Sequence, residues 1–151
     1  MALAAVLDTN VLIAALRSPL GASYQILRRV GTGAFDIELS VPLVLEYESV
    51  AKRDLPALGL TAADVDAVLD FLCRAGRHRA IYFHWRPALP DPQDDLVLEL
   101  AVASGCPVVV THNVRHFAGA ERFGVTPVRP RDFLAMLRGL DLASPRPNVA
   151  P

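Results

Sequence analysis

The chain has 151 residues, of which 52% are hydrophobic and 21% charged, and its formal net charge is −1 at pH 7. This length and composition predict a single domain with a packed core, and they exclude a disordered chain and a globally basic nucleic-acid-binding protein. Lys52 is the only lysine, so nearly all positive charge is arginine, which suits phosphate contacts but equally fits a compositional bias.

The first half of the chain alternates between strand and helix patterns. We expect strands over residues 3–8 and 35–41, and helices over residues 11–16, 22–30, 42–53 and 61–76. Ser40 and Pro42 mark a helix start, since proline is tolerated in the first helical turn. Thr61 is a capping residue, and Gly76 ends the helix that carries the clearest apolar spacing of three and four residues.

The second half continues this alternation. We expect strands over residues 80–85, 107–111 and 125–128, and helices over residues 94–105 and 129–137, with a loop over 86–93. The run "PVVVT" is β-branched throughout, which is typical of a central strand covered on both faces. This order predicts an α/β fold with helices on both faces of a parallel sheet, in one domain over residues 1–140. The tail, residues 141–151, is rich in proline and is expected to be disordered.

The cysteines and the N-terminus bear on the location of the protein. Cys73 and Cys106 are isolated from each other and from other ligand types, so we expect reduced thiols and no zinc site or disulfide framework. Asp8 interrupts an apolar start that lacks a basic region, so a signal peptide is not expected. No uncharged stretch approaches the roughly 20 residues of a membrane span. We expect a cytoplasmic protein with no membrane contact.

Acidic residues recur where strands end and helices begin. Asp8 ends the first strand, Glu46 lies early in the helix after the second strand, and "DPQDD" opens a later helix. In a parallel α/β layer these points share one edge, so their carboxylates can face a common cleft. Grouped carboxylates raise one another's pKa unless a cation neutralises them, and a set of oxygen ligands favours Mg²⁺ or Mn²⁺.

Each of these residues also has an ordinary structural interpretation. Asp91 can cap the helix that begins at Pro92, and the two acidic residues that follow can complement the helix dipole. Glu46 can be a solvated helix residue, and Asn113 can cap a short helix over residues 114–117. The combination is harder to explain in this way than any single residue.

The motifs resemble those of a known family. "VLDTNVLIAAL", the glutamate after the second strand, "DPQDDLVLELAVASGCPVVVTHNVRHF" and "VTPVRPRDFL" resemble the PIN-domain nucleases, and among them the bacterial VapC-type ribonucleases of toxin–antitoxin pairs. The resemblance runs from about Val6 to Leu137. It implies a three-layer α/β/α sandwich and an endoribonuclease that depends on Mg²⁺ or Mn²⁺. It also implies a cognate antitoxin protein as partner, RNA as substrate and a homodimer in many members.

The resemblance also implies the site residues. Asp8, Glu46 and Asp95 match the three acidic positions, as metal ligands and catalytic residues, and Asn113 matches a fourth catalytic position that is often aspartate. Asp95 is preferred to Asp94 because its spacing to the following strand fits the family.

Other residues would support this set. Thr111 matches a hydroxyl of the family motif, and Asn10 would orient the first aspartate. His116 stands where many members have an acid, and the missing fourth carboxylate leaves a second metal in doubt. Asp91 and Asp94 can compensate for the missing fourth carboxylate.

Arginines around such a cleft would hold the RNA backbone. Arg17 and Arg115 are candidates, as is the cluster Arg74, Arg77 and Arg79. For that cluster, an exposed helix end, where cations suit the helix dipole, is the slightly favoured interpretation.

Two other functions compete with the nuclease. One is a PIN fold with weakened catalysis that only binds RNA or protein, which the asparagine at the fourth position favours faintly. The other is a phosphoryl-switch domain similar to response-regulator receivers. Those domains need a late lysine, and none follows Lys52. The sequence does not identify the RNA target, the antitoxin or the oligomeric state.

Overall fold

The computed structural model describes residues 3–81, 89 and 91–143. In this part of the chain five strands form one sheet in the order β3-β2-β1-β4-β5, and every neighbouring pair is parallel. The strands are β1 (Ala4–Leu7), β2 (Asp36–Leu39), β3 (Arg77–His78), β4 (Val108–Val110) and β5 (Thr126–Val128). The central strand is β1, whose Ala5 is in register with Ile37 on one side and Val108 on the other.

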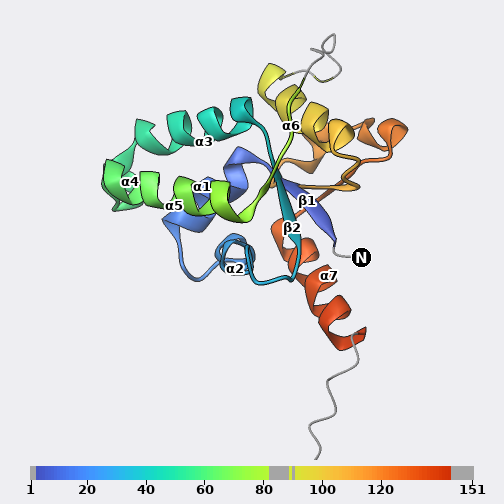
Figure 1. Cartoon of the computed structure of the whole chain (residues 1–151), viewed down its shortest axis with the longest axis horizontal. Helices are drawn as coiled ribbons and strands as arrows, with labels where there is room; N and C mark the ends of the chain where they lie inside the picture. Colours follow the sequence, from blue (N-terminus) through green and yellow to red (C-terminus); the bar gives the residue numbers. More distant parts are fainter. Residues whose placement is uncertain (1–2, 82–88, 90, 144–151) are drawn as a thin grey trace, which may run out of the picture.

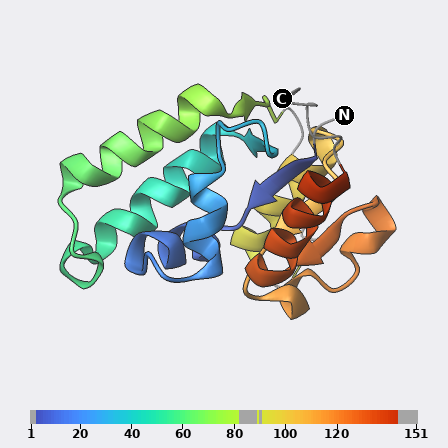
Figure 2. The ribbon, with the colours of Figure 1, turned by 90° about the horizontal axis from the view of Figure 1, so that it is seen from below.

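Helices cover both faces of this sheet. They are α1 (Thr9–Arg17), α2 (Ala22–Arg28), α3 (Val41–Arg53), α4 (Leu55–Leu58), α5 (Ala62–Ala75), α6 (Pro92–Ala103) and α7 (Pro130–Ala143), with 3₁₀ turns η1 (Val114–Phe117) and η2 (Ala120–Phe123). In Figure 1, α1, α3, α4 and α5 gather on one side of β1 and β2, and α6 lies on the other. Figure 2 shows α7 and the segment around β5 next to each other, away from α3 and α5. The expected α/β/α sandwich with a parallel sheet is confirmed.

The core lies where sequence hydrophobicity predicts it. Residues 5–7 of β1 and 108–110 of β4 are buried, as expected for central strands covered on both faces. Phe35 and Phe133 meet edge to face with their ring centroids 5.2 Å apart, which joins the start of β2 to α7.

The predicted helix starts are also confirmed. Thr61 and Asp64 form a reciprocal capping box, because the threonine hydroxyl accepts from the Asp64 N–H (3.1 Å) and the Asp64 carboxylate accepts from the Thr61 N–H (2.9 Å). These hydrogen bonds lower the pKa of Asp64. At the start of α3 the Ser40 hydroxyl accepts from the Leu43 N–H at 3.3 Å. Caps of this kind are readable in sequence because they depend on residues three positions apart.

The described elements differ from the expected ones in three places. The third strand covers only Arg77–His78, residues 79–81 are not strand, and residues 82–85 lie outside the described part. The short helix α4 was not predicted. Helix α7 runs to Ala143, beyond its expected end at residue 137, and residues 144–151 of the expected tail lie outside the described part.

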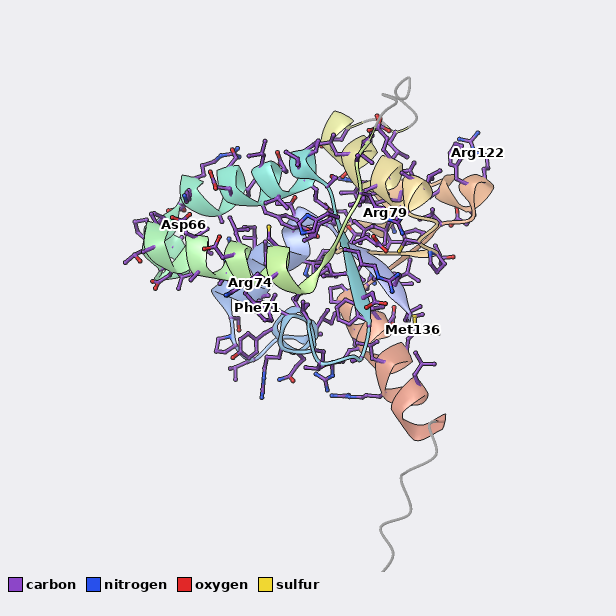
Figure 3. The ribbon with its side chains drawn as sticks, viewed as in Figure 1. Asp66, Phe71, Arg74, Arg79, Arg122 and Met136 are labelled. Atoms are coloured by element: carbon purple, nitrogen blue, oxygen red, sulfur yellow. The ribbon has the colours of Figure 1, made fainter. Side chains whose placement is uncertain are left out.

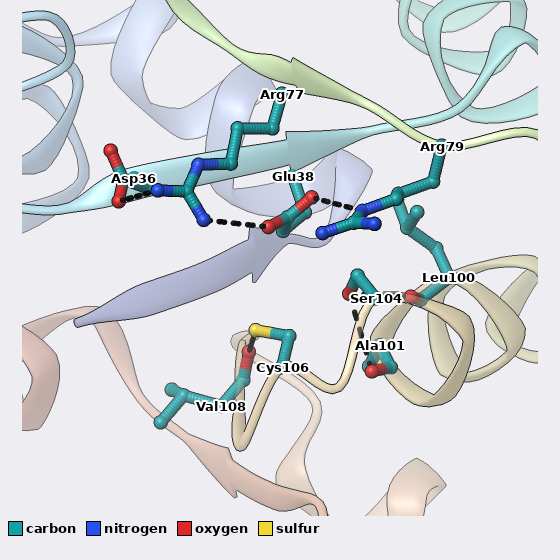
Figure 4. Close-up of polar contacts among 9 residues, drawn as sticks. All are labelled: Asp36, Glu38, Arg77, Arg79, Leu100, Ala101, Ser104, Cys106 and Val108. Carbon is teal, nitrogen blue, oxygen red and sulfur yellow. Dashed lines mark hydrogen bonds and ion pairs between the residues drawn. The ribbon is translucent and has the colours of Figure 1, made fainter. Parts of the chain in front are cut away.

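The early third strand changes the interpretation of the arginine cluster. Arg77 pairs with Asp36 at 2.9 Å, and Arg79 lies 3.5 Å from the carboxylate of Glu38, whose other oxygen is 4.0 Å from Arg77. Figure 4 shows the two arginines on either side of Glu38. Of the three clustered arginines only Arg74 lies in the last turn of a helix. The helix-end interpretation was therefore wrong for Arg77 and Arg79, which neutralise acidic residues of β2.

The helical layer is held together partly by charge at its surface. Lys52 of α3 lies 2.7 Å from Asp66 of α5, which is labelled in Figure 3.

Within the described residues, no helix has both the length and the apolar character needed to cross a membrane.

Candidate active site

Asp8 lies at the point where the strand order of the sheet reverses, between β1 and β4. It follows β1 directly, and its N–H donates to the carbonyl of Val110 at 2.9 Å, so the backbone is held against the end of β4. The chain leads from β1 towards one edge of the sheet and from β4 towards the other. Such switch points place the carboxyl ends of adjacent strands beside an open crevice, where α/β proteins bind ligands.

Thr111 holds the carboxylate of Asp8 in place. Its hydroxyl donates to Asp8 Oδ2 at 2.7 Å, and both residues are buried. Burial raises the pKa of Asp8, and the hydrogen bond from Thr111 partly opposes this rise. The carboxylate is therefore oriented but incompletely stabilised.

Asn10 acts on Asp8 through the loop after β4. Its Nδ2 donates to the Thr111 hydroxyl (3.5 Å), and its Oδ1 accepts from the backbone N–H of His112 (3.3 Å). The Thr111 hydroxyl also accepts from the backbone N–H of Asn113 at 3.0 Å. The supporting positions predicted for Asn10 and Thr111 thus form one network.

Tyr47 fixes the position of α3 against the end of β1. Its hydroxyl donates to the backbone carbonyl of Leu7, next to Asp8, and the whole side chain is buried. Burial and the nearby Asp8 raise the pKa of Tyr47, so it remains a neutral donor. This contact holds α3, which also carries Glu46, against the end of β1, and sequence reasoning missed it. The available signal was the spacing of Tyr47 four residues after buried Leu43.

These elements enclose a cavity of about 520 Å³, which we call the acidic pocket. It is lined by Asp8, Thr9, Asn10, Ile13, Ala14, Arg17, Glu46, Val50, Arg53, Asp91, Asp94, His112, Asn113 and His116. Four of the lining residues are acidic, and they come from the end of β1, from α3 and from the start of α6. The structure thus brings together Asp8, Glu46 and Asn113, which are distant in sequence.

Asp94 is the most perturbed acid of the pocket. It is only 7% exposed, and its Oδ2 is buried without a hydrogen bond, while the Nδ1 of His116 lies 3.4 Å away. Burial, followed by the negative charges of Asp8 and Asp91, raises the pKa of Asp94 to about 6, and the nearby His116 partly opposes this rise. A buried carboxylate with an unsatisfied oxygen is costly, so this one is poised to accept a cation or a proton.

Asp95, the preferred third acid, is placed differently. It is absent from the described lining of the acidic pocket, and its Oδ1 accepts a hydrogen bond from the backbone N–H of Leu89 at 3.0 Å. Successive residues of a helix point about 100° apart, and here Asp94 faces the pocket while the Asp95 carboxylate is turned towards the Leu89 backbone. The structure brings Asp94 beside Asp8, where the family spacing favoured Asp95.

Arginines enter the pocket from two helices. Arg17 lines it as predicted, whereas Arg115 lies on η1 and is absent from the described lining. Arg53 was missed, although Glu46, Val50 and Arg53 are spaced at i, i+4 and i+7 and so share one face of α3. That spacing could have identified it.

The donor set fits a magnesium-like ion that keeps part of its water shell. Among the described residues, no three acidic, histidine or cysteine side chains already form a cluster that could hold a metal ion. Mg²⁺ is usually bound by one or two carboxylates and several waters, and the unsatisfied carboxylate of Asp94 beside Asp8 meets that requirement.

Comparisons with known proteins identify the family and the fold. A family model described as the PIN domain matches residues 4–115. The fold is similar to that of VapBC2 from Rickettsia felis, solved bound to a DNA fragment from their promoter, with a TM-score of 0.57 and 14% identity. That likeness covers 84% of this chain and 98% of the other, and at this identity it concerns the fold alone. Comparison with curated protein sequences gives no match.

Proposed function

Since the chain belongs to the PIN-domain family, we propose that it is an endoribonuclease that depends on Mg²⁺ or Mn²⁺. One observation carries the proposal most directly: the buried, unsatisfied carboxylate of Asp94 faces the same pocket as Asp8. Such an arrangement is unfavourable without a cation, and polar groups that are poorly satisfied are typical of functional sites.

Asp8 and Asp94 would hold the divalent ion, and Glu46 would complete the anionic wall from α3. When bound, the ion lowers the pKa of a water and neutralises charge that develops on the phosphate. Thr111 keeps Asp8 in one orientation, so the pocket loses little conformational freedom on binding. Asn113 offers an uncharged donor or acceptor at the mouth of the pocket.

The reaction would be hydrolysis of an RNA phosphodiester. The water oxygen bonds to phosphorus and gives up a proton, the bond from phosphorus to O3′ breaks, and O3′ takes up a proton, which leaves a 5′-phosphate and a 3′-hydroxyl. Arg17 and Arg53 line the pocket and would bind the non-bridging phosphate oxygens, which the carboxylates would otherwise repel.

The partners follow from the same proposal. A small antitoxin protein would cover the pocket, in line with the fold shared with the Rickettsia felis VapBC2. We also propose that the protein acts in the cytoplasm and forms a homodimer. Co-expression with the product of the neighbouring gene, followed by copurification and an RNA cleavage assay, tests the antitoxin.

A cleavage assay with a matched pair of variants tests the reaction. Asp8→Asn should abolish Mn²⁺-dependent cleavage of a 5′-labelled single-stranded RNA, whereas Asp70→Asn, at an exposed position of α5, should cleave like the wild type. Cleavage by the Asp8→Asn protein at the wild-type rate contradicts the mechanism. RNA binding by a wild-type protein that never cleaves with Mg²⁺ or Mn²⁺ favours the binding module instead.

A substitution at Thr111 tests the support of Asp8. Thr111→Val keeps the shape but removes the hydroxyl, so the apparent affinity for Mn²⁺ should fall by roughly 10- to 100-fold, as for other residues that orient metal ligands. Thr111→Ser should restore most of it. The Mn²⁺ concentration dependence of the cleavage rate measures both, and equal curves for valine and wild type would refute this role.

A further inference from the structure

A second cavity, also of about 520 Å³, adjoins the acidic pocket. We call it the arginine pocket, and it is lined by Ala14, Arg17, Ser18, Gly21, Ala22, Ser23, His112, Arg129, Pro130 and Arg131. Three of these residues, Ala14, Arg17 and His112, line both cavities. The two cavities therefore lie next to each other, with these residues between them.

The charge of the arginine pocket is opposite to that of its neighbour. Arg17 comes from the last turn of α1, Arg129 from the segment before α7, and Arg131 from the first turn of α7. None of the three makes an ion pair with another described residue, and no acidic residue appears in the described lining. In a chain of net charge −1, three free guanidinium groups at one cavity are a local concentration of positive charge.

The wall between the two cavities is held in place. Ser23 of α2 is buried, and its hydroxyl lies 3.1 Å from Nε2 of His112. The backbone N–H of His112 is held by Asn10, which belongs to the network around Asp8. The Ser23 and His112 part of the arginine pocket is thus fixed relative to Asp8.

We propose that the arginine pocket binds a backbone phosphate of single-stranded RNA, next to the phosphate that is cleaved in the acidic pocket. This inference rests on the proposed function and adds the path of the substrate. Guanidinium groups match the geometry of phosphate oxygens, and the carboxylates cannot hold a polyanion by themselves. The strand runs from the acidic pocket past Arg17 and His112 to Arg129 and Arg131. Contacts to phosphate position a strand without reading its bases, so this pocket contributes affinity and not sequence preference.

The test measures RNA binding separately from cleavage. The full-length Asp8→Asn protein binds a fluorescent single-stranded RNA in anisotropy titrations over a range of salt concentrations, with and without Arg129→Gln/Arg131→Gln. The double variant should lose roughly 10-fold in affinity, as expected for charge-assisted hydrogen bonds. The slope of log K against log[salt] should become shallower by about 0.7, the value for one single-strand phosphate contact.

Two controls assign the effect to phosphate at this pocket. Arg28→Gln/Arg138→Gln removes the same charge from exposed positions of α2 and α7 that do not line the arginine pocket, and it should leave affinity within about twofold, since surface charges outside the pocket are screened. Single-stranded DNA of the same sequence should lose as much affinity as RNA in the Arg129→Gln/Arg131→Gln protein. A loss confined to RNA would overturn the phosphate assignment, and so would equal losses in the two double variants.

Hydrolysis of bis(p-nitrophenyl) phosphate separates this proposal from the nuclease proposal. This diester is too small to span both cavities, so its Mn²⁺-dependent hydrolysis should be unchanged by Arg129→Gln/Arg131→Gln, while kcat/KM for RNA falls. If the wild type hydrolyses neither substrate but the variant still binds RNA more weakly, the nuclease function fails and the arginine pocket stands. If RNA binding is insensitive to the two arginines, the arginine pocket is refuted whatever the hydrolysis shows.

Discussion

Replacement of Asp94 by asparagine should stabilise the protein without metal and remove its response to metal. In the folded protein burial and the charges of Asp8 and Asp91 raise the pKa of Asp94 from its ordinary 3.8 to about 6. The folded state therefore binds more protons than the unfolded state between these values. Stability from this group is greatest below about pH 4 and is lost as the pH rises through about 6, so the ionised carboxylate is a net cost at neutral pH.

The size of this cost follows from the shift. About two pKa units correspond to at most about 3 kcal/mol, and water in the open pocket screens the charges, which leaves about 1–2 kcal/mol. Asparagine removes the charge at nearly constant volume. In EDTA at pH 7.5, Asp94→Asn should thus raise the melting temperature by roughly 2–10 °C for a domain of this size. The gain should vanish near pH 4, where the wild-type carboxyl is mostly protonated.

Mn²⁺ should reverse the order of thermal stability of the wild type and Asp94→Asn. Thermal melts in EDTA and in 5–10 mM Mn²⁺ would measure the stabilisation that binding provides. The wild type should gain stability from Mn²⁺, and Asp94→Asn should gain little. Asp95→Asn is the matched control, since its amide oxygen can still accept from Leu89, and it should respond to Mn²⁺ like the wild type. A metal-free Asp94→Asn protein less stable than wild type at pH 7.5, or an equal Mn²⁺ response, would refute the reasoning.

Two further predictions concern the frame around the site. Tyr47→Phe removes the hydroxyl that donates to the Leu7 carbonyl and should cost about 1–2 kcal/mol in urea unfolding; an unchanged midpoint would contradict the role given to this bond. Glu38 is 1% exposed while its two arginines are about half exposed, so Arg77→Ala/Arg79→Ala, which leaves a buried carboxylate unpaired, should cost about 3 kcal/mol. Glu38→Gln should cost clearly less because the arginines can be solvated, and the reverse order in urea midpoints would show that Glu38 is not the vulnerable partner.

Burial makes the Cys106 thiol unreactive, which composition by itself does not establish. Its side chain is buried beside the start of β4 (Figure 4), and burial raises the pKa of its thiol to about 11. The thiol therefore stays protonated and unreactive at neutral pH, in line with the reduced cysteine expected from the sequence.

Local patterns in the sequence determined the alternating elements, the caps at Ser40 and Thr61 and the position of Asp8 at the end of a buried strand. These features depend on neighbours within a few residues, and a parallel sheet then brings strand ends to one edge. The third strand was expected too late in the chain because its two residues carry no periodicity. Its place was decided by pairing with β2 and by the charges of Asp36 and Glu38.

Only the tertiary structure decided which acids meet. Asp94 and Asp95 are both aspartates and are adjacent in sequence. The orientation of α6 against β1 turns Asp94 towards Asp8 and Asp95 towards the backbone of Leu89. The arginine pocket is a similar case, since Arg17 and Arg131 are 114 positions apart and become neighbours only when α7 packs beside α2. Helix rotation and packing between distant segments depend on the whole core, and so no local pattern specifies them.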